Sequence, residues 1–158
     1  MTRLWLLLLG LATCSGLWGQ GSHGYVFAGP GGTAASGYTN RTFHLGAGGE
    51  KVFSPGIGVG IEVGYLGQTG HFNSGLGLVS PNGYYHFLDR RGKADPFVTA
   101  GYTLLFRTDT ANLFNYGAGL NYWLSEHLGA KVEFRDHVYA RDSKSVHYWG
   151  FRFGVTFR

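Results

Sequence analysis

The chain has 158 residues, of which 28 are glycine, 16% are aromatic and only 14% are charged. Soluble domains are typically about 25% charged, so this composition disfavours an ordinary soluble domain, and the length allows one domain rather than two. The net charge of +4 comes without a stripe of clustered Lys and Arg, so we expect no nucleic-acid partner.

Residues 1–20 have the features of a secretory signal peptide. Arg3 supplies the positive start, and the apolar run that follows at 4–12 is about half as long as a membrane-spanning helix. Cleavage between about residues 15 and 20 leaves one domain, at 21–158. The single cysteine, Cys14, lies in this segment, so no disulfide is expected in the mature domain. The run "LATC" also resembles a bacterial lipoprotein box, with Thr13 in place of the usual small residue, which leaves lipidation of Cys14 open.

After the signal peptide, segments of alternating side-chain character recur along the chain, and none shows helical periodicity. The breaks between them are rich in Gly, Asn, Asp, Ser and Pro, as strand connections are. A share of about 17 residues for each strand and its connection suits segments of 9–11 residues that cross a bilayer at a tilt, in an even number. The predicted strands are eight: 23–28, 41–48, 56–66, 75–87, 96–106, 115–124, 127–139 and 146–158.

The two faces of these strands decide between a membrane barrel and a soluble sandwich or lipocalin-like barrel. One face is apolar, and the other alternates glycine with charged or amide side chains. Glycine weakens a solvent-exposed strand, whereas small residues suit the narrow lumen of a closed eight-stranded barrel. We therefore predict an all-β fold, an eight-stranded antiparallel up-and-down transmembrane β-barrel. The predicted lipid-facing residues are Ile57, Val59, Ile61, Val63, Leu120, Val132, Phe134 and Phe151.

The last segment, "HYWGFRFGVTFR", places bulky apolar side chains on one face and Gly, Thr and Arg on the other. This alternation predicts the final strand of the barrel, with an aromatic face toward lipid. Aromatic residues near strand ends are candidates for the girdles at the two membrane surfaces. These candidates are Tyr65, Phe106, Trp123, Tyr139 and Trp149.

The whole mature chain resembles the small outer-membrane protein A-like β-barrel domain family, most clearly in "YVFAGPGG", "ADPFVTAGYTLLF", "YGAGLNYWLSEHLGAKVEFRDHVY" and "FRFGVTFR". The resemblance implies an outer-membrane protein with both termini in the periplasm. It also implies three periplasmic turns, at 49–55, 88–95 and 125–126, and four outward loops, at 29–40, 67–74, 107–114 and 140–145. The implied partners are outer-membrane lipids, lipopolysaccharide and the outer-membrane assembly machinery, and a monomer is expected.

The end of the chain resembles the C-terminal aromatic signal that the assembly machinery reads. The residues that carry this resemblance are Phe153, Val155 and Phe157. One departure is visible, because Arg158 follows Phe157, whereas the commonest form of the signal ends on the aromatic residue itself.

A charged set falls on the predicted lumen face of three strands. Charges removed from water must be paired or remain hydrated, so we interpret this set as an internal ion-pair network that plugs the barrel. A proton or solute path is the alternative. The set consists of Glu62, Lys131, Glu133, Arg135 and Arg152.

Enzymatic activity is the other alternative, because some barrels of this size modify lipid A. The deacylases carry a His-x-Ser motif, but the nearest match here, "HVY" at 137–139, lacks the serine. The acyltransferases place His, Asp and Ser at the outer surface, and Asp142, Ser143, Ser145 and His147 match no specific order. No zinc spacing of histidines and no phosphate loop is visible, so no catalytic residue, metal or cofactor is expected. The predicted function is a non-enzymatic integral barrel with a structural or surface-contact role. A lipid-modifying enzyme and a narrow channel or small-ligand carrier remain as alternatives.

Overall fold

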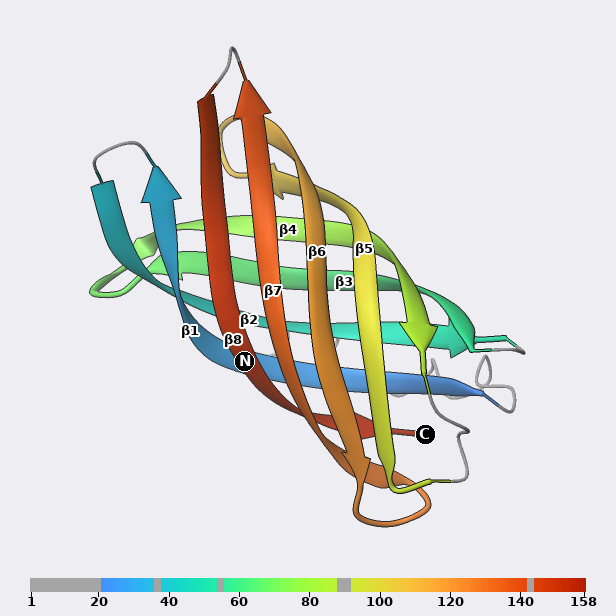
Figure 1. Ribbon diagram of the computed structural model, residues 1–158. Helices are drawn as coiled ribbons and strands as arrows, with labels where there is room; N and C mark the ends of the chain where they lie inside the picture. The colour runs from blue at the N-terminus through green and yellow to red at the C-terminus, as the bar shows by residue number, and fades with distance from the viewer. Residues whose placement is uncertain (1–20, 36–37, 54–55, 88–91, 142–143) are drawn as a thin grey trace, which may run out of the picture.

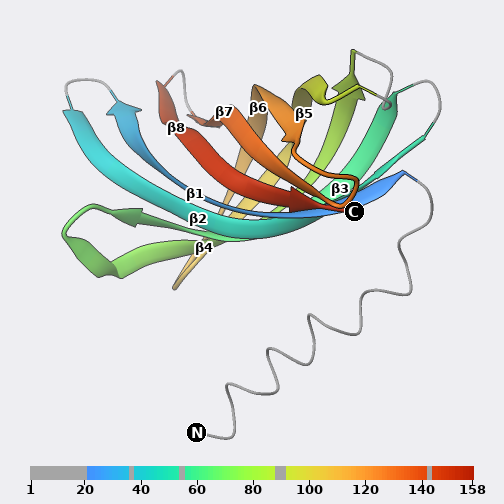
Figure 2. The same ribbon diagram turned by 90° about the horizontal axis from the view of Figure 1, so that it is seen from below.

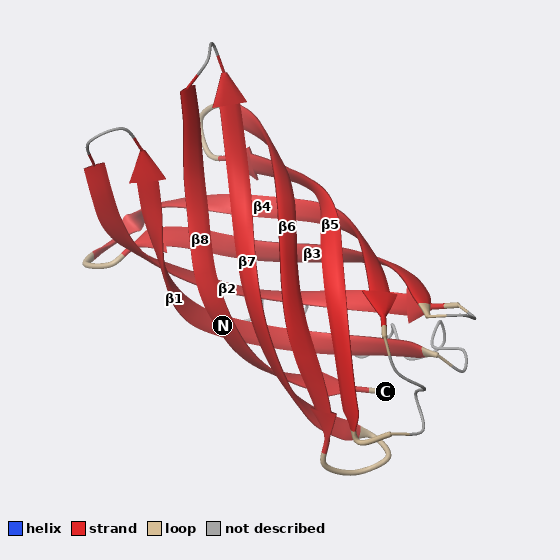
Figure 3. Cartoon of the chain, viewed as in Figure 1, coloured by secondary structure: helices blue, strands red, loops and turns tan. Residues whose placement is uncertain are grey.

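The computed structural model describes residues 21–35, 38–53, 56–87, 92–141 and 144–158. The predicted signal peptide, its cleavage site and Cys14 lie outside the described residues. The described part of the chain is built from strands and their connections (Figure 3). Within that part there is no helix of sufficient length and apolar character to cross a membrane.

The eight strands form one closed antiparallel barrel (Figure 1). Each strand pairs with its neighbours in the chain, and β1 pairs with β8 to close the sheet. The predicted fold, an eight-stranded antiparallel up-and-down barrel, is thereby confirmed. The strands are β1 (Ser22–Ala35), β2 (Tyr38–Val52), β3 (Ile57–Gln68), β4 (His71–His86), β5 (Ala94–Phe106), β6 (Thr110–Trp123), β7 (Leu128–Arg141) and β8 (Lys144–Phe157).

Several strands are longer than predicted, and the connections are shorter. The predicted loop 29–40 was wrong for most of its length, because β1 runs on to Ala35 and β2 starts at Tyr38. A Cβ atom added at Gly31 would lie 2.2 Å from the carbonyl oxygen of Trp149 in β8, so glycine lets these two backbones approach closely. The other predicted loops shrink in the same way, since β3, β4, β6, β7 and β8 extend into them.

The strand directions divide the connections between two ends of the barrel (Figures 1 and 2). One end, the terminal end, carries the start of β1, the end of β8 and the connections that follow β2, β4 and β6. The other, the loop end, carries the connections that follow β1, β3, β5 and β7. Side chains along each strand alternate between the lumen and the outer wall, as the pleat of a strand requires.

The distribution of side chains is inverted relative to a soluble protein. Large apolar residues on the outer wall are exposed, including all eight that were predicted to face lipid, while many buried side chains are polar or charged. A wall of this kind has no favourable contact with water. Two predicted girdle residues were wrong, because Trp123 and Tyr139 point into the barrel. Successive side chains of a strand point to opposite faces, and Tyr122 and Leu124 on either side of Trp123 are exposed, so Trp123 points inward.

Candidate functional site

The five charged residues predicted for the lumen lie together in the interior of the barrel, and all of them are buried. β7 alone contributes three of them, Lys131, Glu133 and Arg135, because residues two apart share a face. Arg152 on β8 is the direct partner of Glu133 in the sheet register. Glu62 reaches the same region from β3, so the cluster joins strands that are not neighbours in the sheet.

Each charge in this lumen network has an opposite charge beside it. Arg152 donates from Nη1 to both carboxylate oxygens of Glu62, at 3.0 Å each. Glu133 contacts three cations: the Arg135 guanidinium, which donates to its Oε1, Lys131 Nζ at 3.3 Å and Arg152 Nη1 at 3.5 Å. Burial of these charges is tolerable because the partners remain in contact.

Aromatic rings complete the surroundings of the cations. Lys131 Nζ lies 3.9 Å from the ring centroid of Phe97 and 4.5 Å from that of Tyr25. The Arg152 guanidinium carbon lies 4.4 Å from the ring centroid of Phe27. The network has three cations and two carboxylates, and the negative faces of these rings offset part of the excess positive charge.

Hydrogen bonds to uncharged side chains extend the network through the lumen. Arg135 donates from Nη1 to Asn115 Oδ1 at 2.7 Å, and Asn115 Nδ2 donates to Asn82 Oδ1 at 2.9 Å. The second guanidinium nitrogen of Arg152 lies 3.0 Å from His137 Nε2. Further buried contacts join Tyr25 with Tyr84 at 2.8 Å, Ser80 with Thr103 at 2.8 Å, Thr103 with His137 at 2.9 Å and His44 with Arg152 at 3.1 Å.

An apolar layer closes the lumen toward the loop end. One leucine from each of β3, β4, β5 and β6 is buried there, and Leu76, Ala111, Tyr139 and Tyr148 pack against them. This layer offers no hydrogen bond to an ion that would have to leave its hydration shell. We call it the leucine layer; it consists of Leu66, Leu78, Leu105 and Leu113.

The terminal end of the lumen carries a second polar cluster. His86 lies between two carboxylates, with Nε2 2.7 Å from Glu50 Oε1 and Nδ1 2.8 Å from Asp95 Oδ1. His23 approaches the other oxygen of Glu50, at 3.3 Å. Sequence reasoning placed Glu50 and Asp95 in turns and so missed them. Alternation continued from His44 along β2 would have placed Glu50 on the same lumen face.

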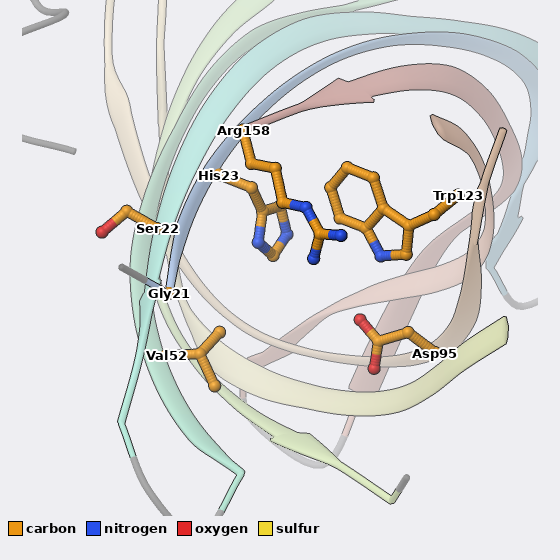
Figure 4. Close-up of a pocket in the computed structure, with 7 residues that line it drawn as sticks. All are labelled: Gly21, Ser22, His23, Val52, Asp95, Trp123 and Arg158. Carbon is orange, nitrogen blue, oxygen red and sulfur yellow. The ribbon is translucent and has the colours of Figure 1, made fainter. Parts of the chain in front are cut away.

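A cavity of about 120 Å³ lies beside this cluster at the mouth of the barrel (Figure 4). The Arg158 guanidinium carbon lies 4.2 Å from the centroid of the Trp123 ring, and Arg158 Nε donates to the carbonyl oxygen of Glu126 at 2.6 Å. Ligand pockets for small molecules usually measure about 300–1,000 Å³, so this space is small. Its lining is Gly21, Ser22, His23, Val52, Asp95, Trp123 and Arg158.

The outer wall holds one polar group of contacts that sequence reasoning missed. Asp136 on β7 accepts a hydrogen bond at Oδ2 from the Tyr116 hydroxyl, at 3.0 Å, and the same oxygen lies 2.7 Å from His147 Nδ1 on β8. We call these three residues the outer polar cluster. His137, the histidine of the "HVY" sequence, lies with its side chain in the lumen.

The remaining predicted residues are placed as follows. Ser145 is exposed on β8, whereas Asp142 and Ser143 lie outside the described residues. Phe153, Val155 and Phe157, the residues of the predicted assembly signal, are exposed on the outer wall of β8. In the described part of the chain, no group of three or more His, Cys, Asp or Glu residues is arranged to hold a metal ion.

Comparison with known proteins identifies the architecture. No family model and no curated protein matches the sequence. Solved structures of similar fold include the following three. The N-terminal β-barrel domain of Pseudomonas aeruginosa OprF is 20% identical, with a TM-score of 0.62, over 89% of this chain and 98% of that chain. Neisserial surface protein A is 11% identical, with a TM-score of 0.69, over 87% and 96%.

The third is the outer membrane enzyme PagL, 20% identical with a TM-score of 0.62 over 82% of this chain and 97% of that chain. At these identities the likeness is one of fold, and it does not transfer an activity. The chain has the fold of the eight-stranded outer-membrane β-barrels.

Proposed function

We propose that the protein is an integral outer-membrane barrel that is closed to solute flow and has a structural or surface-contact role. The observation that carries the proposal is the inverted distribution of side chains, apolar on the wall and charged in the lumen. Only a lipid environment makes such a wall favourable, and a closed barrel leaves no unpaired strand edge inside the bilayer.

The filled lumen supports a closed barrel over the narrow channel. Eight strands leave an interior that side chains can fill. The lumen network lies in the middle, the leucine layer lies toward the loop end, and Arg158 packs against Trp123 at the terminal end. The lumen charges therefore serve the stability of the barrel, and contacts with other molecules are made by the outer wall and the loop end.

The proposal includes the surroundings of the barrel. The outer wall contacts outer-membrane lipids and lipopolysaccharide, both termini lie in the periplasm, and the assembly machinery recognises the aromatic face of β8. A monomer suffices, because β1 and β8 already pair with each other and the closed sheet leaves no edge for a second copy.

Cell fractionation tests this proposal. The full-length protein is expressed in a Gram-negative host, and its membranes are separated and washed with alkaline carbonate, with a soluble periplasmic protein as the control. The protein is expected to stay with the outer membrane while the control is washed away. Protease added to whole cells is expected to spare a tag placed at the C terminus. Recovery of the protein as a soluble periplasmic monomer would contradict the proposal.

A further inference from the structure

Asp136 is an ionisable residue on the outer wall, with apolar side chains on either side of it along its own strand. Its neighbours on the same face of β7 are Phe134 and Val138, and its partner across the sheet is Trp149. Its exposed fraction is only 6%, because neighbouring side chains cover it. A carboxylate at such a place is costly, so an ionisable residue facing lipid is a candidate for a functional role.

The contacts of Asp136 are those of a carboxylate that orients a histidine base. Oδ2 lies 2.7 Å from His147 Nδ1, which favours the tautomer with the proton on Nδ1 and leaves the lone pair on Nε2. The Tyr116 hydroxyl donates to the same oxygen and holds the carboxylate in place. The other oxygen, Oδ1, is buried and has no hydrogen-bond partner among the described residues. The His147 side chain remains 37% exposed, so its ring is accessible from the membrane side.

A serine stands beside this histidine on the same face. Ser145 precedes His147 by two residues in β8, so both side chains point to the outer wall, and Ser145 is exposed. A nucleophile, a base and a residue that orients the base are the three parts of a hydrolytic triad. We propose that Ser145, His147 and Asp136 form a hydrolytic site on the outer wall, with acyl ester lipids as its substrates.

The position of the site along the barrel wall indicates which bond of a lipid it would cleave, namely the ester bond. Along β8 the outward side chains toward the terminal end are Trp149, Phe151 and Phe153, and toward the loop end the apolar run stops at His147. The site therefore lies where the hydrocarbon core gives way to the polar interfacial region of the bilayer. Ester groups of membrane lipids lie at this boundary, between acyl chains and headgroups. With the termini in the periplasm, as proposed above, the site faces the outer leaflet.

The reaction balances with water as the only other reactant. Ser145 Oγ attacks the ester carbonyl carbon while its proton passes to His147 Nε2. The bond from that carbon to the lipid alcohol oxygen breaks, and the alcohol takes the proton from His147. Water then attacks the acyl-serine ester, gives a proton to His147, and releases the fatty acid as Ser145 regains its proton. Ser145 and His147 are the catalytic residues, and Asp136 and Tyr116 position the base.

Two measurements on the purified full-length barrel test the proposal. An alkyl fluorophosphonate probe is expected to form a covalent adduct that peptide mass spectrometry places on Ser145. In vesicles of diacyl phosphatidylethanolamine, the protein is expected to release fatty acid. Vesicles of the diether analogue, which has no ester bond, are expected to release none.

Variants separate chemistry from folding. Ser145→Ala is expected to lose the adduct and to reduce release by at least about 100-fold, and Asp136→Asn by about as much. Asp136→Glu keeps the carboxylate and is expected to restore part of the rate, which a purely structural role of Asp136 would not explain. Asn112→Ala, an exposed polar position on β6, is the matched control and is expected to leave both readouts unchanged. Heat-dependent gel mobility verifies that each variant is folded.

An adduct on another serine, or release of fatty acid that Ser145→Ala leaves unchanged, would overturn the proposal. So would folded wild type that forms no adduct and releases no fatty acid. None of these results would affect the closed-barrel function proposed above, because that function depends on fractionation and on the lumen, which this site does not touch.

Discussion

Glu133 holds a central place among the buried charges, because it contacts Lys131, Arg135 and Arg152 at once. Replacing it with alanine leaves three cations with Glu62 as the remaining carboxylate of the network. We expect Glu133→Ala to lower the free energy of unfolding by roughly 3–5 kcal/mol, the usual cost of an unpaired buried charge. Urea unfolding in lipid vesicles, followed by tryptophan fluorescence, measures this change.

A second substitution tests the cause of that loss. Neutralising one of the cations as well, in Glu133→Ala with Arg135→Met, is expected to recover part of the stability, because one unpaired charge is then absent. Glu126→Ala, at an exposed position in the turn before β7, is the control and is expected to change the free energy of unfolding by less than about 0.5 kcal/mol. A Glu133→Ala barrel as stable as wild type would show that the charges are not paired as described.

Lumen glycines make room for the aromatic rings that surround the cations. A Cβ atom added at Gly119 would lie 2.5 Å from the Phe97 ring and 2.7 Å from the Val132 carbonyl oxygen, so Gly119→Ala is expected to destabilise the barrel by about 1–3 kcal/mol. At Gly83, on the outer wall, the nearest atom would be 3.7 Å away, so Gly83→Ala is expected to be neutral or slightly stabilising. Equal effects of the two substitutions on the unfolding midpoint would contradict this account.

At the scale of the elements, β8 closes the barrel by pairing with both β7 and β1. Phe157 ends its outer face and is 44% exposed, which is the position of an aromatic residue available for recognition. Phe157→Asn is expected to reduce the folded yield in outer membranes severalfold. Deletion of Arg158, which contacts Trp123 and the Glu126 backbone, is expected to reduce it less. Normal yield of Phe157→Asn in cells would argue against the signal.

The alternation of side-chain character along the sequence predicts the strands well and their ends poorly. Alternation identified all eight strands and the faces of most of their residues, because burial inside or outside a barrel follows parity. It failed at strand ends such as Gly29–Gly32 in β1, where glycine and proline resemble a loop although the backbone stays in the ladder. Connections are short here because the antiparallel pairing continues almost to each tip.

The candidate sites also divide into residues that the sequence predicts and residues that it does not. The five lumen charges were predictable, because each needs only the parity of its own strand. The leucine layer was not, because it requires the pairing of four strands around a closed barrel. The contact between Asp136 and His147 was missed for a simpler reason. The predicted tip loop at 140–145 hid the register that brings residue 138 opposite His147 and so places Asp136 beside it.

At the scale of the whole molecule, three groups of contacts lie in series along the axis of the barrel. From the terminal end they are the contacts of Arg158 and Trp123, the lumen network, and the leucine layer. They differ in kind, since the first is a cation on an aromatic ring, the second is a set of paired charges and the third is apolar. If the lumen is closed as we propose, an ion that crosses it would have to displace all three, and opening one would leave two in place.

This arrangement predicts that the purified wild-type barrel gives no steady, large conductance in planar bilayers. The network resists opening because its charges contact one another at 3.0–3.5 Å, and the leucine layer offers an ion no replacement for water. Leu105→Ser with Leu113→Ser is expected to leave the barrel closed, since the network still fills the middle of the lumen. A large-pore porin inserted under the same conditions verifies that channels are detected. A stable nanosiemens-scale channel in the wild type would show that the lumen is a pathway rather than a filled core.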